Sequence, residues 1–437
     1  MQDLIIQQIL TRAKKAAQSV EVFMFASEET PVVFEANRLK SLQSKESSSI
    51  ALRIFKDGRI GFASSNKPDD VDGLVQAAVE TSQFGAPAIF ELPGHAEFPL
   101  VEVYDPLVEK VSLEKMVNLG EEMVLALTAH TPEILCEAGI SRNTISISIA
   151  NSSGLKAEYN KSAFAIGIEG TVIHGSDMLF VGESESSCRP LLDTSNILNT
   201  VRRQLDWART QARVPTGKLP IIFTPDGVAS ALISPLMAAF NGKVVLEGAS
   251  PLGDKIGRKV FDQKLNLYDD ATVAFQPGSR PFDDEGIPSQ KLPLIEAGVP
   301  KNFLYDLKTA ALAHTRSTGH GGRGGGLPSP TPGAFVFNNG DVSLESMMAD
   351  IKEGLFIEQV MGATQGNILG GDFSGNVLLG YKIENGRIAG RVKDTMVFGN
   401  VYELLKDIAA VGNDGRWLGR RLYTPSISCP SISVSSK

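Results

Sequence analysis

The sequence predicts an α+β fold, in which strands are joined by hairpins and helices stand in separate blocks. Two turns indicate hairpins, because Asp57-Gly58 follows an apolar strand pattern and Asn385-Gly386 interrupts another. Residues 143–183 alternate apolar and polar side chains, as a meander of half-buried strands does. Consecutive hairpins with separate helices argue against a parallel βαβ fold.

The first part of the chain, residues 1–213, is predicted to be a domain with an antiparallel sheet flanked by helices. Apolar residues at three- and four-residue spacing predict a helix over 4–16, a second after Asp70 and a third that begins at Ser112 as N-cap. A long helix over 195–213 ends this part. The strands are expected at 20–25, 31–34, 50–55 and across 143–183.

A linker is predicted at 214–220, which contains two prolines and a glycine. The domain after it, residues 221–437, is expected to be glycine-rich and built of mostly antiparallel, twisted sheets. It opens with a short strand over 220–223. Its helices are predicted at 228–240, 343–353 and 402–408.

Composition limits the classes of function. The 437 residues contain 42 Lys and Arg against 50 Asp and Glu, a net charge of −8 that opposes direct nucleic-acid binding. A hydrophobic content of 42% is enough to bury a core. The longest apolar stretch, 228–240, is shorter than the roughly 20 residues that cross a bilayer, and the N-terminus lacks the apolar run of a secretion signal. We therefore expect a soluble, cytoplasmic protein without a membrane partner.

Familiar metal and nucleotide motifs are missing. The five histidines form no HExxH pair, and Cys136, Cys188 and Cys429 are too far apart for a CxxC site. Residues 319–324 match GxGxxG, but three prolines in the next eight residues prevent the helix that a dinucleotide loop must open. This loop is either a flexible surface segment or a bare backbone that approaches a ligand.

One acidic run and two arginines remain as candidate binding groups. Asp283, Asp284 and Glu285 are suited to bind a cation or to act as paired carboxylates, while the Gly-Ile-Pro that follows predicts a solvated turn instead. Arg316 precedes the glycine-rich loop and Arg323 lies within it, where they are suited to bind a carboxylate.

Several segments in order resemble the TldD/PmbA family. The resemblance runs from about residue 20 to the C-terminus, and the GDFS…IENG block is its most specific part. The segments are LRIFKDGRIGFASSN (52–66), NSSGL (151–155), PFDDEGIPSQ (281–290), GDFSGNVLLGYKIENGRI (371–388), FGN (398–400) and VGND (411–414).

The resemblance implies a cytoplasmic metalloprotease of two related subunits, TldD and TldE (also called PmbA), that cleaves unfolded or small peptides. The TldD type holds zinc through an HExxxH helix and a later cysteine, and the Glu would activate water. By rough placement, Ser234, Pro235 and Ala239 stand where His, Glu and His would be, and Cys429 stands near the third protein ligand. Residues 240–261 further resemble the TldE/PmbA branch.

The resemblance therefore predicts a subunit without catalytic residues, metal or other cofactor of its own, paired with a TldD-like subunit that holds the zinc. The family's older name, modulator of DNA gyrase, suggests DNA, but the negative net charge opposes direct contact. Candidate residues for a peptide or partner groove are Arg316, His320, Arg323, Gly375 and Gly380.

Two alternatives stay open at this point. One is a homodimeric peptide-binding module with no protease partner. The other is an independent hydrolase with an unrecognised site near Asp283, Asp284 and His320.

Overall fold

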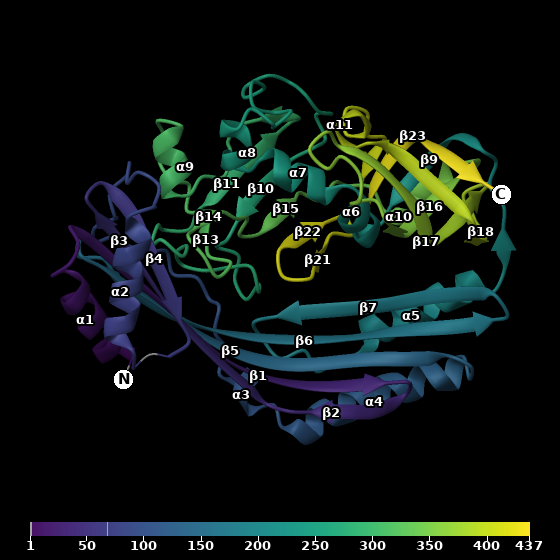
Figure 1. Ribbon diagram of the computed structural model, residues 1–437. Helices are drawn as coiled ribbons and strands as arrows, with labels where there is room; N and C mark the ends of the chain where they lie inside the picture. The colour runs from purple at the N-terminus through teal and green to yellow at the C-terminus, as the bar shows by residue number, and fades with distance from the viewer. Residues whose placement is uncertain (1, 68) are drawn as a thin grey trace.

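The computed structural model describes residues 2–67 and 69–437 of the chain. A long antiparallel sheet of order β4-β3-β1-β5-β6-β7, with β2 beside β1, forms the lower part of the molecule in Figure 1. Its strands are β1 (Ser19–Glu35), β2 (Arg38–Leu42), β3 (Lys45–Lys56), β4 (Arg59–Ser65), β5 (Leu135–Asn151), β6 (Lys156–His174) and β7 (Asp177–Ser187).

The two strands expected at 20–25 and 31–34 form one continuous strand, β1. Pro31 lies where the neighbour of β1 changes from β3, which pairs up to Glu29, to β2, which pairs from Val32. A strand tolerates a residue without an N–H at such a break in its edge pairing.

Both hairpin predictions are confirmed. Asp57 and Gly58 have φ angles of 51° and 74° and join β3 to β4. Asn385 and Gly386 have φ angles of 50° and 78° and join β17 (Asp372–Glu384) to β18 (Arg387–Val392). Positive φ at both turn residues gives the backbone twist that a two-residue hairpin needs.

Helices cover one face of the long sheet. α1 (Gln2–Ala13) and α2 (Val71–Ser82) pack on β1, β3 and β4 at one end, while α4 (Leu113–His130) packs on β5 and β1 at the other. Ser112 caps α4 as predicted, since its hydroxyl accepts a hydrogen bond from the Lys115 N–H. α3 (Leu107–Lys110) and α5 (Ser195–Ala208) complete this layer, and α5 lies along β7 (Figure 1).

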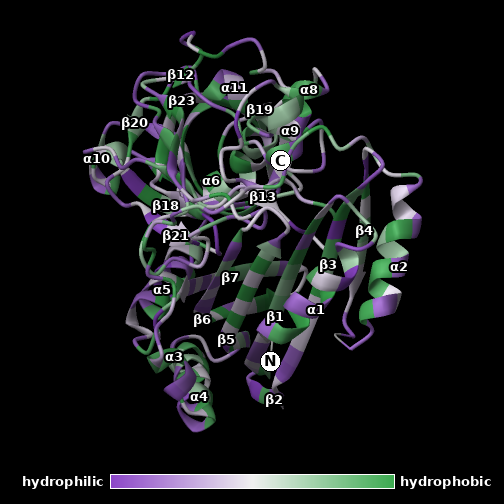
Figure 2. Cartoon of the chain, turned by 90° about the vertical axis from the view of Figure 1, so that its left-hand side faces the viewer, coloured by the Kyte–Doolittle hydropathy of each residue, from purple (hydrophilic) through white to green (hydrophobic). Residues whose placement is uncertain are grey.

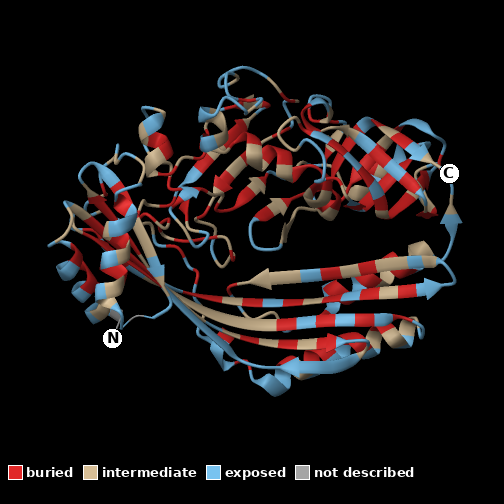
Figure 3. Ribbon diagram, viewed as in Figure 1, coloured by how far each residue is buried: buried red, intermediate tan, exposed pale blue. Residues whose placement is uncertain are grey.

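The strands of this sheet alternate hydrophobic with hydrophilic residues (Figure 2), and buried with exposed ones (Figure 3). Even-numbered side chains of β1, β5 and β6, such as Phe34, Ile140 and Ile168, belong to the core shared with α4. The odd-numbered side chains face away from the helices.

Two further sheets form the rest of the chain. The larger has the order β16-β9-β23-β19-β17-β18-β8, and an extra β16–β17 pairing closes five of its strands into a ring. The smaller has the order β12-β11-β10-β15-β22-β21. Besides β17 and β18, the strands of the larger sheet are β8 (Gln211–Ala212), β9 (Gly217–Phe223), β16 (Glu353–Met361), β19 (Thr395–Asn400), β20 (Ala410–Val411) and β23 (Ile427–Ser436).

Most neighbouring strands in these sheets are antiparallel, as predicted; the parallel pairs are β9–β16, β8–β18 and β15–β22. The strands of the smaller sheet are β10 (Leu267–Asp270), β11 (Lys291–Glu296), β12 (Val299–Pro300), β15 (Phe335–Phe337), β21 (Arg416–Leu418) and β22 (Leu422–Thr424). A separate short pair is formed by β13 (Gly321–Gly322) and β14 (Ser329–Pro330).

The helix expected over 228–240 is two helices, α6 (Pro225–Ala231) and α7 (Ile233–Ala239). Pro235 explains the break at Leu232, because proline has no N–H for the carbonyl four residues earlier and its ring crowds that turn. The other short helices are α8 (Gly242–Leu246), α9 (Leu307–Leu312), α10 (Leu344–Ala349) and α11 (Val401–Leu404).

The predicted linker, 214–220, is partly a strand, since β9 begins at Gly217. The predicted helix before it ends at Ala208 rather than at residue 213. Within residues 2–67 and 69–437, no helix has the length and apolar character needed to cross a membrane.

Candidate functional site

The helix α7 carries the residues at the places of the expected zinc motif. The Ser234 side chain is half-buried, whereas Pro235 and Ala239 are buried. The Pro235 carbonyl accepts a hydrogen bond of 3.1 Å from the Tyr402 hydroxyl, and the Ala239 carbonyl accepts one of 2.6 Å from Ser250. These three side chains offer one hydroxyl, and no imidazole or carboxylate, to a metal ion.

Cys429 lies on β23 in the apolar core of the second half. Its Sγ is 3.9 Å from the Leu404 carbonyl oxygen, and burial raises the pKa of the thiol to about 12. Zinc binds the thiolate, which this site disfavours. Among the residues that the structure describes, no three His, Cys, Asp or Glu side chains are grouped so that they could hold a metal. The donor set around Cys429 therefore does not fit a zinc ion.

The acidic run and the glycine-rich loop meet in one buried ionic cluster, which consists of Glu21, Arg53, Asp283, Asp284, Glu285 and Arg323. Asp283 accepts a hydrogen bond of 2.7 Å from the Gly321 N–H, and Asp284 accepts one of 2.7 Å from the Arg323 N–H. The solvated turn expected at 283–285 is wrong, since Asp283 and Glu285 are fully buried.

This ionic cluster joins the long sheet to the second half of the chain. Arg53 on β3 donates to Glu285 at 2.6 Å and to Glu21 on β1 at 2.8 Å, and Arg323 also pairs with Glu21. Burial raises the pKa of Asp283 and of Glu285, against the opposing charges of Arg280 and Arg53 respectively. A substrate cannot reach the buried side chains of Glu21, Arg53, Asp283 and Glu285, whereas Asp284 is partly exposed. The contacts of the cluster hold the two layers together.

His320 lies beside this cluster in an arrangement that resembles a catalytic triad. Its Nε2 is 3.0 Å from Asp269 Oδ1, and its Nδ1 is 2.9 Å from Thr318 Oγ1. However, His320 is 2% exposed and Asp269 is fully buried, so no substrate can reach this imidazole. The geometry favours a structural role over the hydrolase alternative.

The five predicted groove residues do not form one surface. His320 and Arg323 are buried at or beside the ionic cluster, whereas Arg316 is exposed. Gly375 and Gly380 lie in β17 against β16, where an added Cβ would be 2.5 Å from Val360 Cγ1 and 2.6 Å from Val377 Cγ1 respectively. These glycines allow close packing of the sheet.

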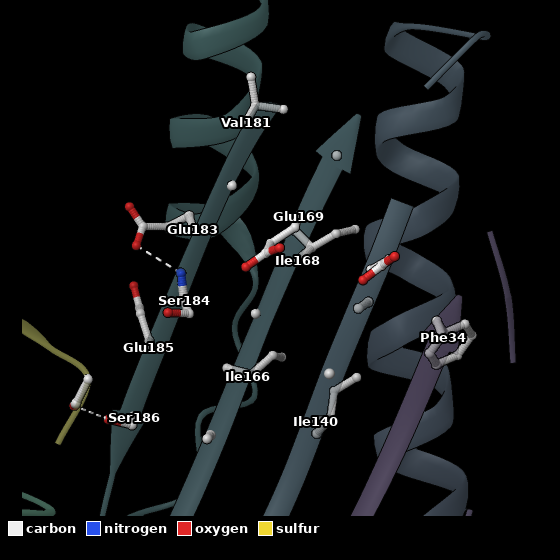
Figure 4. A pocket seen from close by; sticks show the side chains of 18 of the residues that line it. Phe34, Ile140, Ile166, Ile168, Glu169, Val181, Glu183, Ser184, Glu185 and Ser186 are labelled. Atoms are coloured by element: carbon white, nitrogen blue, oxygen red, sulfur yellow. Dashed lines mark hydrogen bonds between the residues drawn. The ribbon is translucent and has the colours of Figure 1, made fainter. Parts of the chain in front are cut away.

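A cavity of about 890 Å³ lies between the odd-numbered face of the long sheet and the second half of the chain. Its floor is formed by β1, β5, β6 and β7 (Figure 4). Its roof includes Glu358, Leu379 and Arg420. At the other end of the same sheet face, Phe282 belongs to an apolar cluster with Phe23 and Leu155, and this cluster fills the space above the sheet.

The floor of this cavity is unusual in composition. Small residues occupy most of its odd-numbered positions on β5 and β6, among them Gly139, Ala165 and Gly167, and two others are the acidic Glu137 and Glu169. The alternation in 135–141 and 165–171 is the sequence signal for this face, but it does not distinguish a cavity floor from an ordinary solvent-exposed face.

The roof is anchored to the edge of the long sheet by charged contacts. Arg416 donates to Glu183 of β7 at 2.6 Å and also pairs with Asp226. Gln204 donates to Glu358 at 2.6 Å, and burial raises the pKa of Glu358. These contacts hold the cavity roof in place against β7 and α5.

Comparisons with known proteins agree on one family. The family model for the PmbA/TldA metallopeptidase C-terminal domain matches residues 216–436, and the model for PmbA/TldA metallopeptidase domain 1 matches residues 20–82. An uncharacterised protein of Methanocaldococcus jannaschii is 28% identical over 97% of this chain and 98% of its own length. A metalloprotease PmbA homolog of Haemophilus influenzae is 24% identical over 92% of this chain and 89% of its own.

Solved structures share the fold. TldE from Thermococcus kodakarensis superposes with a TM-score of 0.90 at 23% identity, over 99% of this chain and all of that one. A proposed modulator of DNA gyrase from Thermotoga maritima also gives 0.90, at 22% identity and full coverage of both chains.

Proposed function

The chain belongs to the PmbA/TldD metallopeptidase family, and from this premise we propose that it is a TldE-like subunit without a metal of its own. In this proposal it pairs, in the cytoplasm, with a TldD-like zinc protease that degrades or processes unfolded or small peptides. The observation that carries the proposal is the donor set of α7. In this proposal Ser234, Pro235 and Ala239 take the places of the zinc motif, and their side chains include no imidazole to bind zinc and no carboxylate to act as a base.

The role of such a subunit is to complete a binding chamber. The cavity beside the long sheet supplies a surface for an extended polypeptide, while the partner's metal supplies the hydrolytic chemistry. The buried ionic cluster supports this role, because it fixes the angle between floor and roof at the closed end.

Co-expression with an HExxxH-bearing chain from the same genome tests the proposal. The tagged chain is expected to elute with that partner in near-equal amount, and zinc is expected in the pair but not in the tagged chain alone. A matched partner whose two metal histidines are replaced by alanine should still co-elute but lose zinc. If the tagged chain returns only itself, the homodimeric peptide-binding module replaces this proposal. If the isolated chain cleaves peptides in the presence of a chelator, the independent hydrolase does.

A further inference from the structure

Two glutamates on the cavity floor face each other without compensation. Glu137 of β5 and Glu169 of β6 are register partners on one face of the sheet, and both are exposed. Within the described part of the chain, neither carboxylate has a hydrogen-bond or ion-pair partner. Like charges directly opposite each other destabilise a sheet. The pair therefore lowers the stability of the fold, and a cation bound beside the two carboxylates would relieve this repulsion.

The floor around this pair is open to a polypeptide backbone. A Cβ built on Gly139 meets no atom within 4 Å, so the space above β5 is free at this point. The lining of β6 runs from Ala165 to Thr171, which spans roughly 20 Å at ~3.3 Å per residue. This length accommodates an extended segment of about six residues.

The charge of the cavity lining is strongly one-sided. Among the described residues of its lining there are seven carboxylate side chains and one cationic side chain, that of Arg420. Arg416 and Arg203 pair with three roof and edge carboxylates from outside, which leaves the floor glutamates uncompensated. The lining carboxylates are Glu29, Glu137, Glu169, Glu183, Glu185, Asp226 and Glu358. Charge complementarity therefore selects a cationic occupant.

We propose that this cavity binds an extended polypeptide segment that carries lysine or arginine, with one cationic side chain placed between Glu137 and Glu169. The inference rests on the proposed function, which makes a peptide the ligand, and adds a charge preference to it. In an extended segment every second side chain points to the same face, so alternating basic residues would place their charges toward the floor.

Binding of two labelled peptides to the full-length chain, measured by fluorescence anisotropy, tests this inference. One peptide carries alternating lysines, and the other carries glutamines at the same positions. We expect the lysine peptide to bind about ten-fold more tightly, as two weak ion pairs allow, and the preference to shrink at high salt. The double variant Glu137→Gln with Glu169→Gln is expected to lose the preference while it still binds the glutamine peptide.

The matched control is Glu121→Gln with Glu158→Gln, which makes the same change of charge at exposed sites outside the cavity lining. It should keep the preference. A second variant, Gly139→Phe, fills the floor without changing its charge and should weaken both peptides. Equal binding of the two peptides to the unaltered chain, or an unchanged preference in the double variant, would overturn the inference.

The failure of this inference is separable from the failure of the proposed function. If the chain co-elutes with a zinc protease and the pair cleaves both peptides equally, the function stands and the charge preference is wrong. If the lysine peptide binds but no protease partner co-elutes, the cavity assignment stands and the function is wrong.

Discussion

Glu285 and Glu169 carry the same side chain in opposite settings. Glu285 is fully buried and bonds to Arg53 and to the Leu307 N–H, whereas Glu169 is exposed and faces Glu137. A buried carboxylate costs stability when it ionises and costs more when its arginine partner is removed, whereas an exposed unpaired one is free to bind a ligand. Glu285 is therefore expected to make stability depend on pH. Glu169, with Glu137, is expected to lower stability through the repulsion of like charges.

Glu285→Gln is expected to flatten the dependence of stability on pH. Because burial raises the pKa of Glu285 in the folded state, its contribution is present below the ordinary carboxyl pKa of ~4 and is lost as the pH rises through the folded value near neutrality. As the pH rises from ~5 to ~8, the free energy of unfolding of the variant should fall by about 1–3 kcal/mol less than that of the unaltered chain. Urea unfolding across this range measures the difference, and parallel curves would contradict the assignment.

Removal of the charge repulsion on the cavity floor is expected to stabilise the fold. The double variant Glu137→Gln with Glu169→Gln should raise the free energy of unfolding by a few tenths of a kcal/mol, up to ~1 kcal/mol, because like charges no longer face each other. Thermal unfolding at low salt measures this gain, which should shrink at high salt. A destabilised double variant would show that these glutamates have structural partners instead.

Among the strands and helices, local signals were predictable from the sequence and long-range contacts were not. The two hairpins follow from residues that accept positive φ, at Asp57-Gly58 and Asn385-Gly386. The break before Pro235 was missed because an apolar pattern was read as one helix. The ionic cluster was missed because Arg53 and Glu285 are 232 residues apart, and no local pattern reports such a contact. The alternating strands of the cavity floor leave a local pattern in the sequence. The roof lies over them through long-range contacts, which leave none.

Two glycine-to-alanine substitutions in strands are expected to differ in their effect on stability. Gly375→Ala in β17 places a Cβ 2.7 Å from the Met361 carbonyl oxygen and should destabilise the chain by about 1–3 kcal/mol. Gly139→Ala in β5 meets open space and should leave stability unchanged or slightly higher, since glycine weakens a strand interior. Chemical unfolding of both variants measures this contrast. An equal change in the free energy of unfolding of the two variants would show that Gly375 is not packed more tightly than Gly139.

Across the whole molecule, the two halves of the chain meet at both ends of the long sheet, with the cavity between the contacts. The ionic cluster joins them at one end, and α5 and β7 contact the second half at the other. Phe282 and the ionic cluster fill the space above the first end of the long sheet, and the cavity lies beyond them. Contacts at both ends therefore set the position of the cavity roof, and the ionic cluster supplies those at the closed end. This arrangement makes a single buried arginine important for the assembly of both halves.

Arg53→Met is expected to cost about 3–5 kcal/mol, because it leaves Glu21 and Glu285 buried with one partner fewer. The matched control is Arg12→Met, which removes an exposed pair with Asp72 and should change stability little. Urea unfolding followed by fluorescence compares the two. An equal effect of both variants would mean that the ionic cluster does not join the halves.

The central claim, that this chain is the subunit without catalytic machinery in a two-subunit peptidase, is tested most directly by one measurement. The cleavage rate of an unfolded peptide is compared for the isolated chain, for the HExxxH-bearing partner and for the two together. We predict no cleavage by the isolated chain, and cleavage by the pair that a chelator abolishes. Cleavage by the isolated chain at the rate of the pair would contradict the claim.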